Sequence, residues 1–98
     1  MIVVTAKFKC LQGMRNKVVE FARPCVETTR KEKGCLRYEL FISSEDDETL
    51  QFIEEWADLD SLRAHMGTPH LAKFAEQRKG SVEEDSAVKV FDASEVSL

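Results

Sequence analysis

The strongest constraint on the fold is the order in which two hydrophobic periods follow one another along the chain. Residues 2–11 alternate apolar and polar side chains, which is typical of a half-buried strand. Residues 14–33 carry apolar side chains at spacings of three and four, which predicts an amphipathic helix. Residues 35–44 and 49–56 alternate again, and the acidic segment 45–48 between them predicts a hairpin. The chain therefore begins as strand, helix, strand, strand.

The second half of the chain predicts an interrupted helix and one more strand. Asp58 or Asp60 can cap a short helix that runs through residues 62–66. A threonine-proline pair then restarts a helix over residues 68–79, because proline suits the first helical position. The polar segment after this helix is expected to be a loop, and residues 87–91 predict the last strand.

The order β-α-β-β-α-β predicts the fold class. It is that of a ferredoxin-like α+β domain, with a four-stranded antiparallel sheet and both helices on one face. The 98 residues suffice for one domain, residues 1–98, and not for two. The uncovered face would still carry Val3, Phe41 or Ile53. A second copy could cover that face by using the same patch twice, so we expect a homodimer.

Charge, hydrophobicity and cysteine spacing argue against several kinds of partner and site. The net charge is −4, and no run of basic residues is longer than Arg30-Lys31, so neither nucleic acid nor an anionic membrane is expected. No segment is apolar enough to span a bilayer or to act as a signal peptide, and we expect a cytoplasmic protein. Cys10, Cys25 and Cys35 form no CxxC pair, which favours reduced thiols over a disulfide framework or a zinc site.

The chain carries no phosphate loop, dinucleotide fingerprint, metal motif or nucleophile elbow, so no cofactor is expected. His65 and His70 flank the predicted helix break. Either ring could act as an acid or base, and either could simply bond to a backbone carbonyl. As a metal pair they lack the i,i+4 spacing and an evident third ligand, so no metal is expected.

The predicted strands supply the other candidates for a site. Glu54 lies on an apolar strand face, where a carboxylate is either a base with a raised pKa or the partner of an arginine or histidine. Tyr38 and Trp56 could stack on a flat aromatic substrate, or could belong to the core. Both readings stay open for each of the three residues.

Three further features carry structural expectations. Arg37 could contact a ligand, but pairing with Glu39 or Glu55 across the sheet is the more ordinary role. Pro24 lies inside the first predicted helix, where it removes a donor and should kink the axis. The weakly patterned tail, residues 92–98, could reach a partner subunit.

Four short segments together resemble the recurring blocks of the antibiotic biosynthesis monooxygenase family. They are KGCLRYEL at 33–40, FIEEW at 52–56, LRAH at 62–65 and TPHL at 68–71. The likeness extends over residues 4–90. It implies a dimeric α/β barrel made of two ferredoxin-like subunits. It also implies oxidation of quinols or polyphenols by O₂ without metal, flavin or haem.

The resemblance implies roles for the candidate residues. His65 or Glu54 would deprotonate an electron-rich phenol, and the anion would pass an electron to O₂ inside a dry pocket. Tyr38, Trp56 and His70 would line that pocket.

Related proteins with other activities suggest alternative functions for this chain. Haem-degrading members use an asparagine on the first strand and a tryptophan on the second helix, and both are missing here. Members that isomerise or degrade the phosphorylated autoinducer-2 signal share similar blocks, and Arg37 with a lysine would then hold the phosphate. A non-enzymatic dimer that binds a small molecule is the third alternative, since fold does not fix function.

Overall fold

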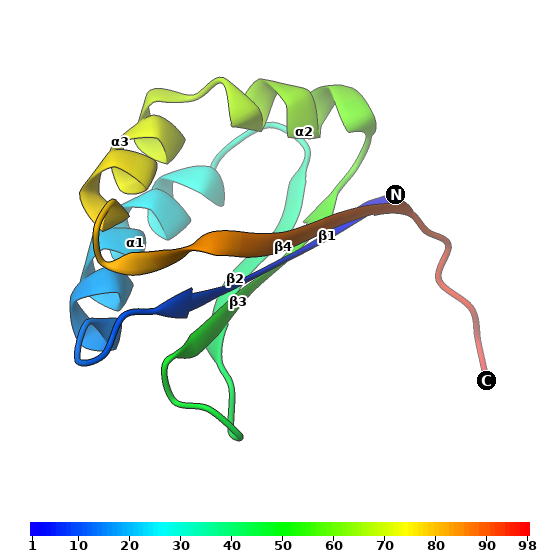
Figure 1. Ribbon diagram of the computed structural model, residues 1–98. Coiled ribbons are helices and arrows are strands. Elements are labelled where there is room, and N and C mark those ends of the chain that lie inside the picture. The colour runs from blue at the N-terminus through cyan, green and yellow to red at the C-terminus, as the bar shows by residue number, and fades with distance from the viewer.

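The computed structural model describes all residues from 1 to 98, and its element order confirms the predicted α+β class. The second predicted helix is present as two shorter helices separated by a break (Figure 1). The elements are β1 (Ile2–Cys10), α1 (Arg15–Thr29), β2 (Cys35–Ile42), β3 (Thr49–Trp56), α2 (Leu59–Met66), α3 (Pro69–Arg78) and β4 (Val82–Asp92).

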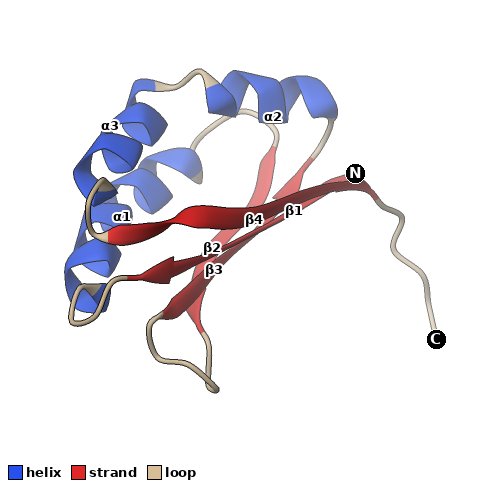
Figure 2. Ribbon diagram, in the orientation of Figure 1, coloured by secondary structure: helices blue, strands red, loops and turns tan.

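The four strands form one antiparallel sheet in the order β2-β3-β1-β4. The three helices all lie on one side of this sheet, and the opposite side is open (Figures 1 and 2). This is the ferredoxin-like arrangement expected from the sequence. None of the three helices is long and apolar enough to span a bilayer.

The core lies between the sheet and the helices, as the period-two pattern requires. Every second residue of β3 is buried, which brings Phe52 and Trp56 to the helix side. Val4 and Phe8 of β1 lie on the same side, and Val18 of α1 packs against them in the same cluster. Strand alternation therefore decides which side chains can face a site beneath the helices.

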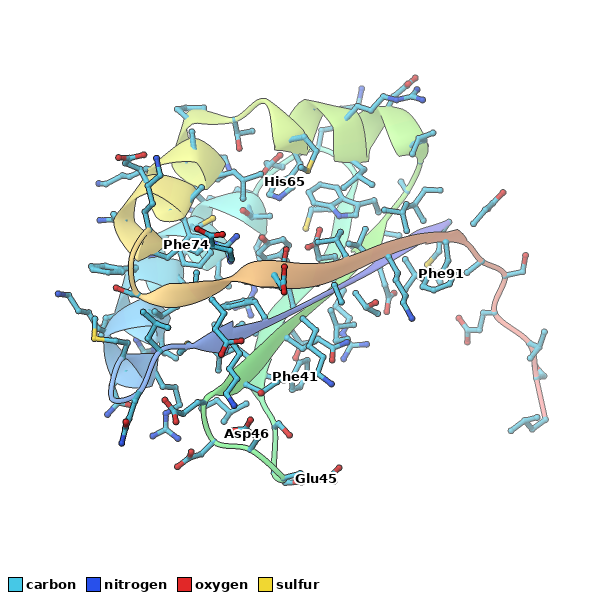
Figure 3. All side chains as sticks on the ribbon, viewed as in Figure 1. Phe41, Glu45, Asp46, His65, Phe74 and Phe91 are labelled. Atoms are coloured by element: carbon cyan, nitrogen blue, oxygen red, sulfur yellow. The ribbon has the colours of Figure 1, made fainter.

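The open side of the sheet keeps large apolar side chains in contact with solvent. Phe41 and Phe91 are 42% and 47% exposed. Figure 3 shows both rings on the side of the sheet away from His65 and Phe74. The expectation that this face is only partly polar is therefore met by Phe41 and Phe91.

Of the two predicted caps of α2, Asp58 is the one used, and the helix begins at Leu59. Two element boundaries differ clearly from the sequence prediction. α1 ends at Thr29 and not at residue 33, because residues 30–34 form turns that lead into β2. β4 begins at Val82, inside the segment expected to be a loop, because that segment pairs with the free edge of β1.

The turn between α1 and β2 depends on Gly34. Its φ is +81°, and its carbonyl oxygen accepts a hydrogen bond from the backbone N–H of Ala57 at 2.8 Å. A Cβ at this position would collide with the side chain of Ser61 on α2. The glycine therefore lets the turn approach α2 closely.

Replacing Gly34 with alanine is expected to lower the free energy of unfolding by about 2–5 kcal/mol. The left-handed backbone accounts for about 1–2 kcal/mol of this, and overpacking for about 1–3 kcal/mol. Gly13 provides the matched control, since its φ is +78° and nothing lies within 4 Å of a Cβ placed there. Urea unfolding should show the larger loss for Gly34→Ala. Equal losses in the two variants would contradict a close approach to Ser61.

Candidate functional site

A cavity of about 290 Å³ lies between the sheet and helices α2 and α3. Its wall is mostly apolar, as is usual for small-molecule sites. The polar side chains on the wall are Tyr38, Glu54, His65, Arg78 and Ser86. Val88 and Val90 of β4 also line the cavity and are 59% and 51% exposed, so the cavity reaches the surface along that edge strand.

The helix break after α2 holds His65 in the cavity wall. At the start of α2, the Asp58 carboxylate accepts the backbone N–H of Ser61 at 2.8 Å. At its end, the Thr68 hydroxyl donates to the carbonyl of His65 at 2.8 Å, and Pro69 then begins α3. The cap before α2 and the restart after it therefore fix the position of His65 (Figure 3). Its side chain is only 2% exposed.

Aromatic rings from the sheet fix the plane of the His65 ring. The Trp56 ring lies 4.8 Å from it between centroids, tilted by 35°. The Tyr38 ring lies 5.3 Å away in an edge-on arrangement. The histidine therefore has little freedom to rotate, and its two nitrogens face defined directions.

Glu32 is the partner of His65, and sequence reasoning did not identify it. It lies in the turn after α1, where its Oε2 is 2.8 Å from Nδ1 of His65 and 2.7 Å from Nε2 of His70. A carboxylate can only accept hydrogen bonds, so both ring nitrogens donate to the same oxygen. The two histidines that the sequence singled out are thus joined through one carboxylate.

This pairing assigns the tautomer of His65. When Nδ1–H donates to Glu32, the neutral ring carries its lone pair on Nε2. Nε2 has no hydrogen-bond partner in the structure, and His65 borders the cavity. A carboxylate behind one nitrogen and a free lone pair on the other form a general-base arrangement.

Tyr38 and Glu54 complete this end of the cavity. Burial raises the pKa of Tyr38 well above its usual range, and the nearby charge of Glu54 adds to the effect. Its hydroxyl therefore stays protonated and can donate a hydrogen bond. Burial also raises the pKa of Glu54, while the indole N–H of Trp56, which donates to Oε1 at 3.0 Å, acts in the opposite sense.

The raised pKa of Glu54 should make the free energy of unfolding depend on pH. The folded state holds the Glu54 proton more tightly than the unfolded chain does, so stability falls as the pH rises from the ordinary glutamate pKa to the raised one. Glu54→Gln removes this loss, and we expect it to raise the free energy of unfolding at neutral pH, with the gain shrinking in acid. Urea unfolding at neutral and acid pH measures the gain, with exposed Glu27→Gln as control. A gain that does not change with pH would contradict a raised pKa of Glu54.

The remaining sequence candidates lie around the cavity and not on its wall. Trp56 is fully buried behind the wall, where it orients Glu54 and His65, so the expected stacking on substrate does not match its position. His70 bonds to Glu32 on the far side of His65. Arg37 lies on the open side of the sheet and pairs with Glu39 at 2.7 Å and Glu55 at 3.3 Å, which is the ordinary role considered for it.

Glu32, His65 and His70 also offer three metal-ligand atoms within 4.8 Å of one another. Zinc bonds at tetrahedral angles would place ligand atoms roughly 3.3 Å apart. The carboxylate oxygen instead lies 2.8 and 2.7 Å from the two ring nitrogens, the separation of N–H···O hydrogen bonds. The cluster as it stands therefore fits the sharing of protons better than the holding of an ion.

Comparisons with known proteins show the family to which the chain is similar. The sequence profile described as antibiotic biosynthesis monooxygenase matches residues 1–77. The chain is 30% identical over 92 residues to the protein named "Probable quinol monooxygenase YgiN" of Escherichia coli K12, covering 84% of this chain and 88% of that one. It is 23% identical to "Uncharacterized protein sll1783" of Synechocystis, covering 96% of this chain but only 64% of that protein's length.

Solved structures give the same result. A crystal structure described as an antibiotic biosynthesis monooxygenase superposes with a TM-score of 0.88 at 32% identity, covering 97% of this chain and all of that one. The named relatives favour a monooxygenase over the isomerase alternative and support an oxidoreductase-type enzyme at the level of the family. The chain belongs to the antibiotic biosynthesis monooxygenase family.

Proposed function

We propose that the protein is a monooxygenase that oxidises a hydroquinone with O₂ without a bound cofactor. The observation that carries the proposal is His65 in the wall of a mostly apolar cavity, with Nδ1 held by Glu32 and Nε2 free. This chemistry needs a base to form the electron-rich anion and a dry space in which the anion meets O₂.

His65 takes the proton from a substrate hydroxyl at Nε2. The ring then becomes an imidazolium, and the Glu32 carboxylate 2.8 Å from Nδ1 stabilises that charge. Glu54 is the weaker candidate for the base, because its Oε1 already accepts a hydrogen bond from the indole N–H of Trp56. Tyr38, with its hydroxyl protonated, donates a hydrogen bond to the substrate oxygen and orients it.

The anion is the reductant in the next step. It gives one electron to O₂, and the two radicals combine at a ring carbon to form a peroxide. Cleavage of the O–O bond leaves one oxygen atom on the ring and releases the other as water. A hydroquinone and O₂ thus yield a hydroxylated quinone and one water molecule. The apolar wall keeps bulk water from the charged intermediates.

Oxygen consumption tests the proposal. Chelator-treated protein that is free of flavin and haem absorbance is mixed with benzo- and naphthohydroquinones, and O₂ uptake and products are followed. We expect protein-dependent uptake and a product heavier by one oxygen atom than the quinone. Uptake no faster than autoxidation for every hydroquinone would contradict the proposal.

We also propose that the protein works as a homodimer in which the open sheet faces of two copies pack together. Phe41 and Phe91 lie on that face and are each more than two-fifths exposed. Val3 pairs with Phe91 across the β1–β4 ladder and extends the apolar patch. A two-fold axis lets the same patch serve both subunits.

Replacing Phe91 with aspartate is expected to shift the protein from dimer to monomer, because a charge in an apolar interface loses its water without gaining a partner. Sedimentation velocity at several protein concentrations measures the change. Leu59→Asp is the control, since Leu59 is 39% exposed on α2, on the side of the sheet away from the proposed interface (Figure 1). A wild-type protein that sediments as a monomer at all concentrations would overturn the dimer proposal.

A further inference from the structure

Arg78 is the one arginine of the chain whose guanidinium contacts no oxygen of the protein. It is the last residue of α3 and lies in the cavity wall, with its Cζ 4.9 Å from the centroid of Phe8 and 5.4 Å from that of Phe74. The other five each donate to or pair with a protein oxygen: Arg15, Arg23, Arg30, Arg37 and Arg63. The chain has 18 acidic and 14 basic residues, so a shortage of acidic partners does not explain this.

The two phenylalanine rings do not satisfy this guanidinium. Their faces attract a cation by about 0.5–2 kcal/mol, but they offer no lone pair to its five N–H groups. Burial lowers the pKa of Arg78, which reflects the loss of water around the charge. A partly buried fork of free donors suits a carboxylate or similar anion, which it can bind through two parallel hydrogen bonds.

Arg78 lies at the opposite end of the cavity from the proton-accepting group. In the sheet, Val4 pairs with Glu54, beside Tyr38, whereas Phe8 pairs with Leu50. Val4 and Phe8 are four residues apart, which is about 13 Å along β1. Two fused aromatic rings with a substituent at each end cover a comparable length. The apolar wall between the ends includes Ala6 and Phe52.

We propose that Arg78 binds an acidic group at the far end of the substrate, so that the cavity selects two-ring aromatic molecules with a hydroxyl at one end and a carboxylate at the other. The hydroxyl would lie at His65 and Tyr38, and the carboxylate at Arg78. The reaction at the hydroxyl rests on the proposed function, but the choice of an anionic ligand rests on Arg78 and the cavity alone.

Binding of a matched pair of probes tests this inference without any turnover. 6-Hydroxy-2-naphthoate and its neutral amide, 6-hydroxy-2-naphthamide, differ only in the charge at one end. Titration calorimetry should show that the wild-type protein binds the acid about 10- to 100-fold more tightly than the amide, the range expected for a hydrogen bond to a charged group. Arg78→Met keeps an apolar stem against Phe8 and Phe74 and should lose the preference, whereas Arg78→Lys should keep part of it.

Lys79→Met is the matched control, because it removes the same charge from the neighbouring residue. The Lys79 side chain is 77% exposed and pairs with Glu76 at 3.6 Å. Its replacement should leave the preference for the acid unchanged. Equal binding of acid and amide by the wild type, or a preference that survives Arg78→Met, would overturn the inference. Loss of the preference in Lys79→Met would also overturn the inference, because the preference for the acid would then reflect the overall charge of the region and not a bond to Arg78.

The outcome separates this inference from the proposed function. A preference for the acid that depends on Arg78, in a protein that consumes no O₂ with any hydroquinone, would support the inference and contradict the proposed function. Oxygen uptake with neutral hydroquinones, together with equal binding of acid and amide, would overturn the inference and support the proposed function.

Discussion

Replacing His65 with glutamine is expected to lower kcat for hydroquinone-dependent O₂ uptake by about 10²–10⁴-fold, the usual contribution of a general base. Glutamine can still donate to Glu32, but its amide does not take a proton. The measurement is O₂ uptake at saturating hydroquinone. KM should change much less than kcat, because the apolar wall that binds the rings is intact.

A second variant separates lost chemistry from lost structure. His65 packs between Trp56 and Tyr38, so a smaller side chain could disturb the core. His65→Ala leaves a space beside Glu32, and added imidazole should restore part of its O₂ uptake if the ring acts as the base. A His65→Gln protein that melts like the wild type and keeps kcat within about twofold would exclude His65 as the base.

Replacing Glu32 with glutamine is expected to lower kcat by about 10- to 100-fold, as is common when a group that orients a catalytic or metal-bound histidine is removed. Glutamine keeps the size of the side chain but removes the charge that stabilises the His65 imidazolium. The predicted loss is smaller than that in His65→Gln because the base itself remains. Steady-state O₂ uptake across a range of pH measures both kcat and the shape of the pH profile.

Two controls sharpen the test of Glu32. Glu27→Gln removes an equal charge from an exposed position on α1 and should leave kcat unchanged. Glu32→Asp keeps the charge but shortens the side chain, and should recover part of the activity. If Glu32→Gln lowers thermal stability but leaves kcat and the pH profile intact, Glu32 is structural only and does not orient the base.

The order of strands and helices could be read from the sequence because the spacing of apolar residues changes between two and three or four from one element to the next. The end of α1 could not, since residues 30–33 are polar and continue the helical pattern without a break until Gly34. The true end at Thr29 depends on the turn that docks against α2. β4 was predicted too short for a related reason. Its first residues are exposed and lack alternation, and only pairing with β1 makes them a strand.

Only some residues of the candidate site could be identified from the sequence. Glu54 could be selected because it lies on an apolar strand face, and His65 because it flanks the predicted helix break. Tyr38 could be selected as an aromatic residue able to stack on a flat substrate. Glu32 and Arg78 could not, because a charged residue at the end of a helix ordinarily faces solvent. Their roles arise from tertiary packing, which brings the turn after α1 to His65 and the end of α3 over Phe8.

In the proposed reaction, His65 removes a proton from the bound hydroquinone before O₂ reacts. A phenol has a pKa of about 10, so holding it as an anion at neutral pH requires about 4 kcal/mol of stabilisation by the site. The most direct measurement is the difference absorption spectrum of 1,4-naphthohydroquinone bound under nitrogen. We expect the band of the anion with wild-type protein and the neutral spectrum with His65→Gln. A neutral spectrum with wild-type protein that turns over in air would contradict it.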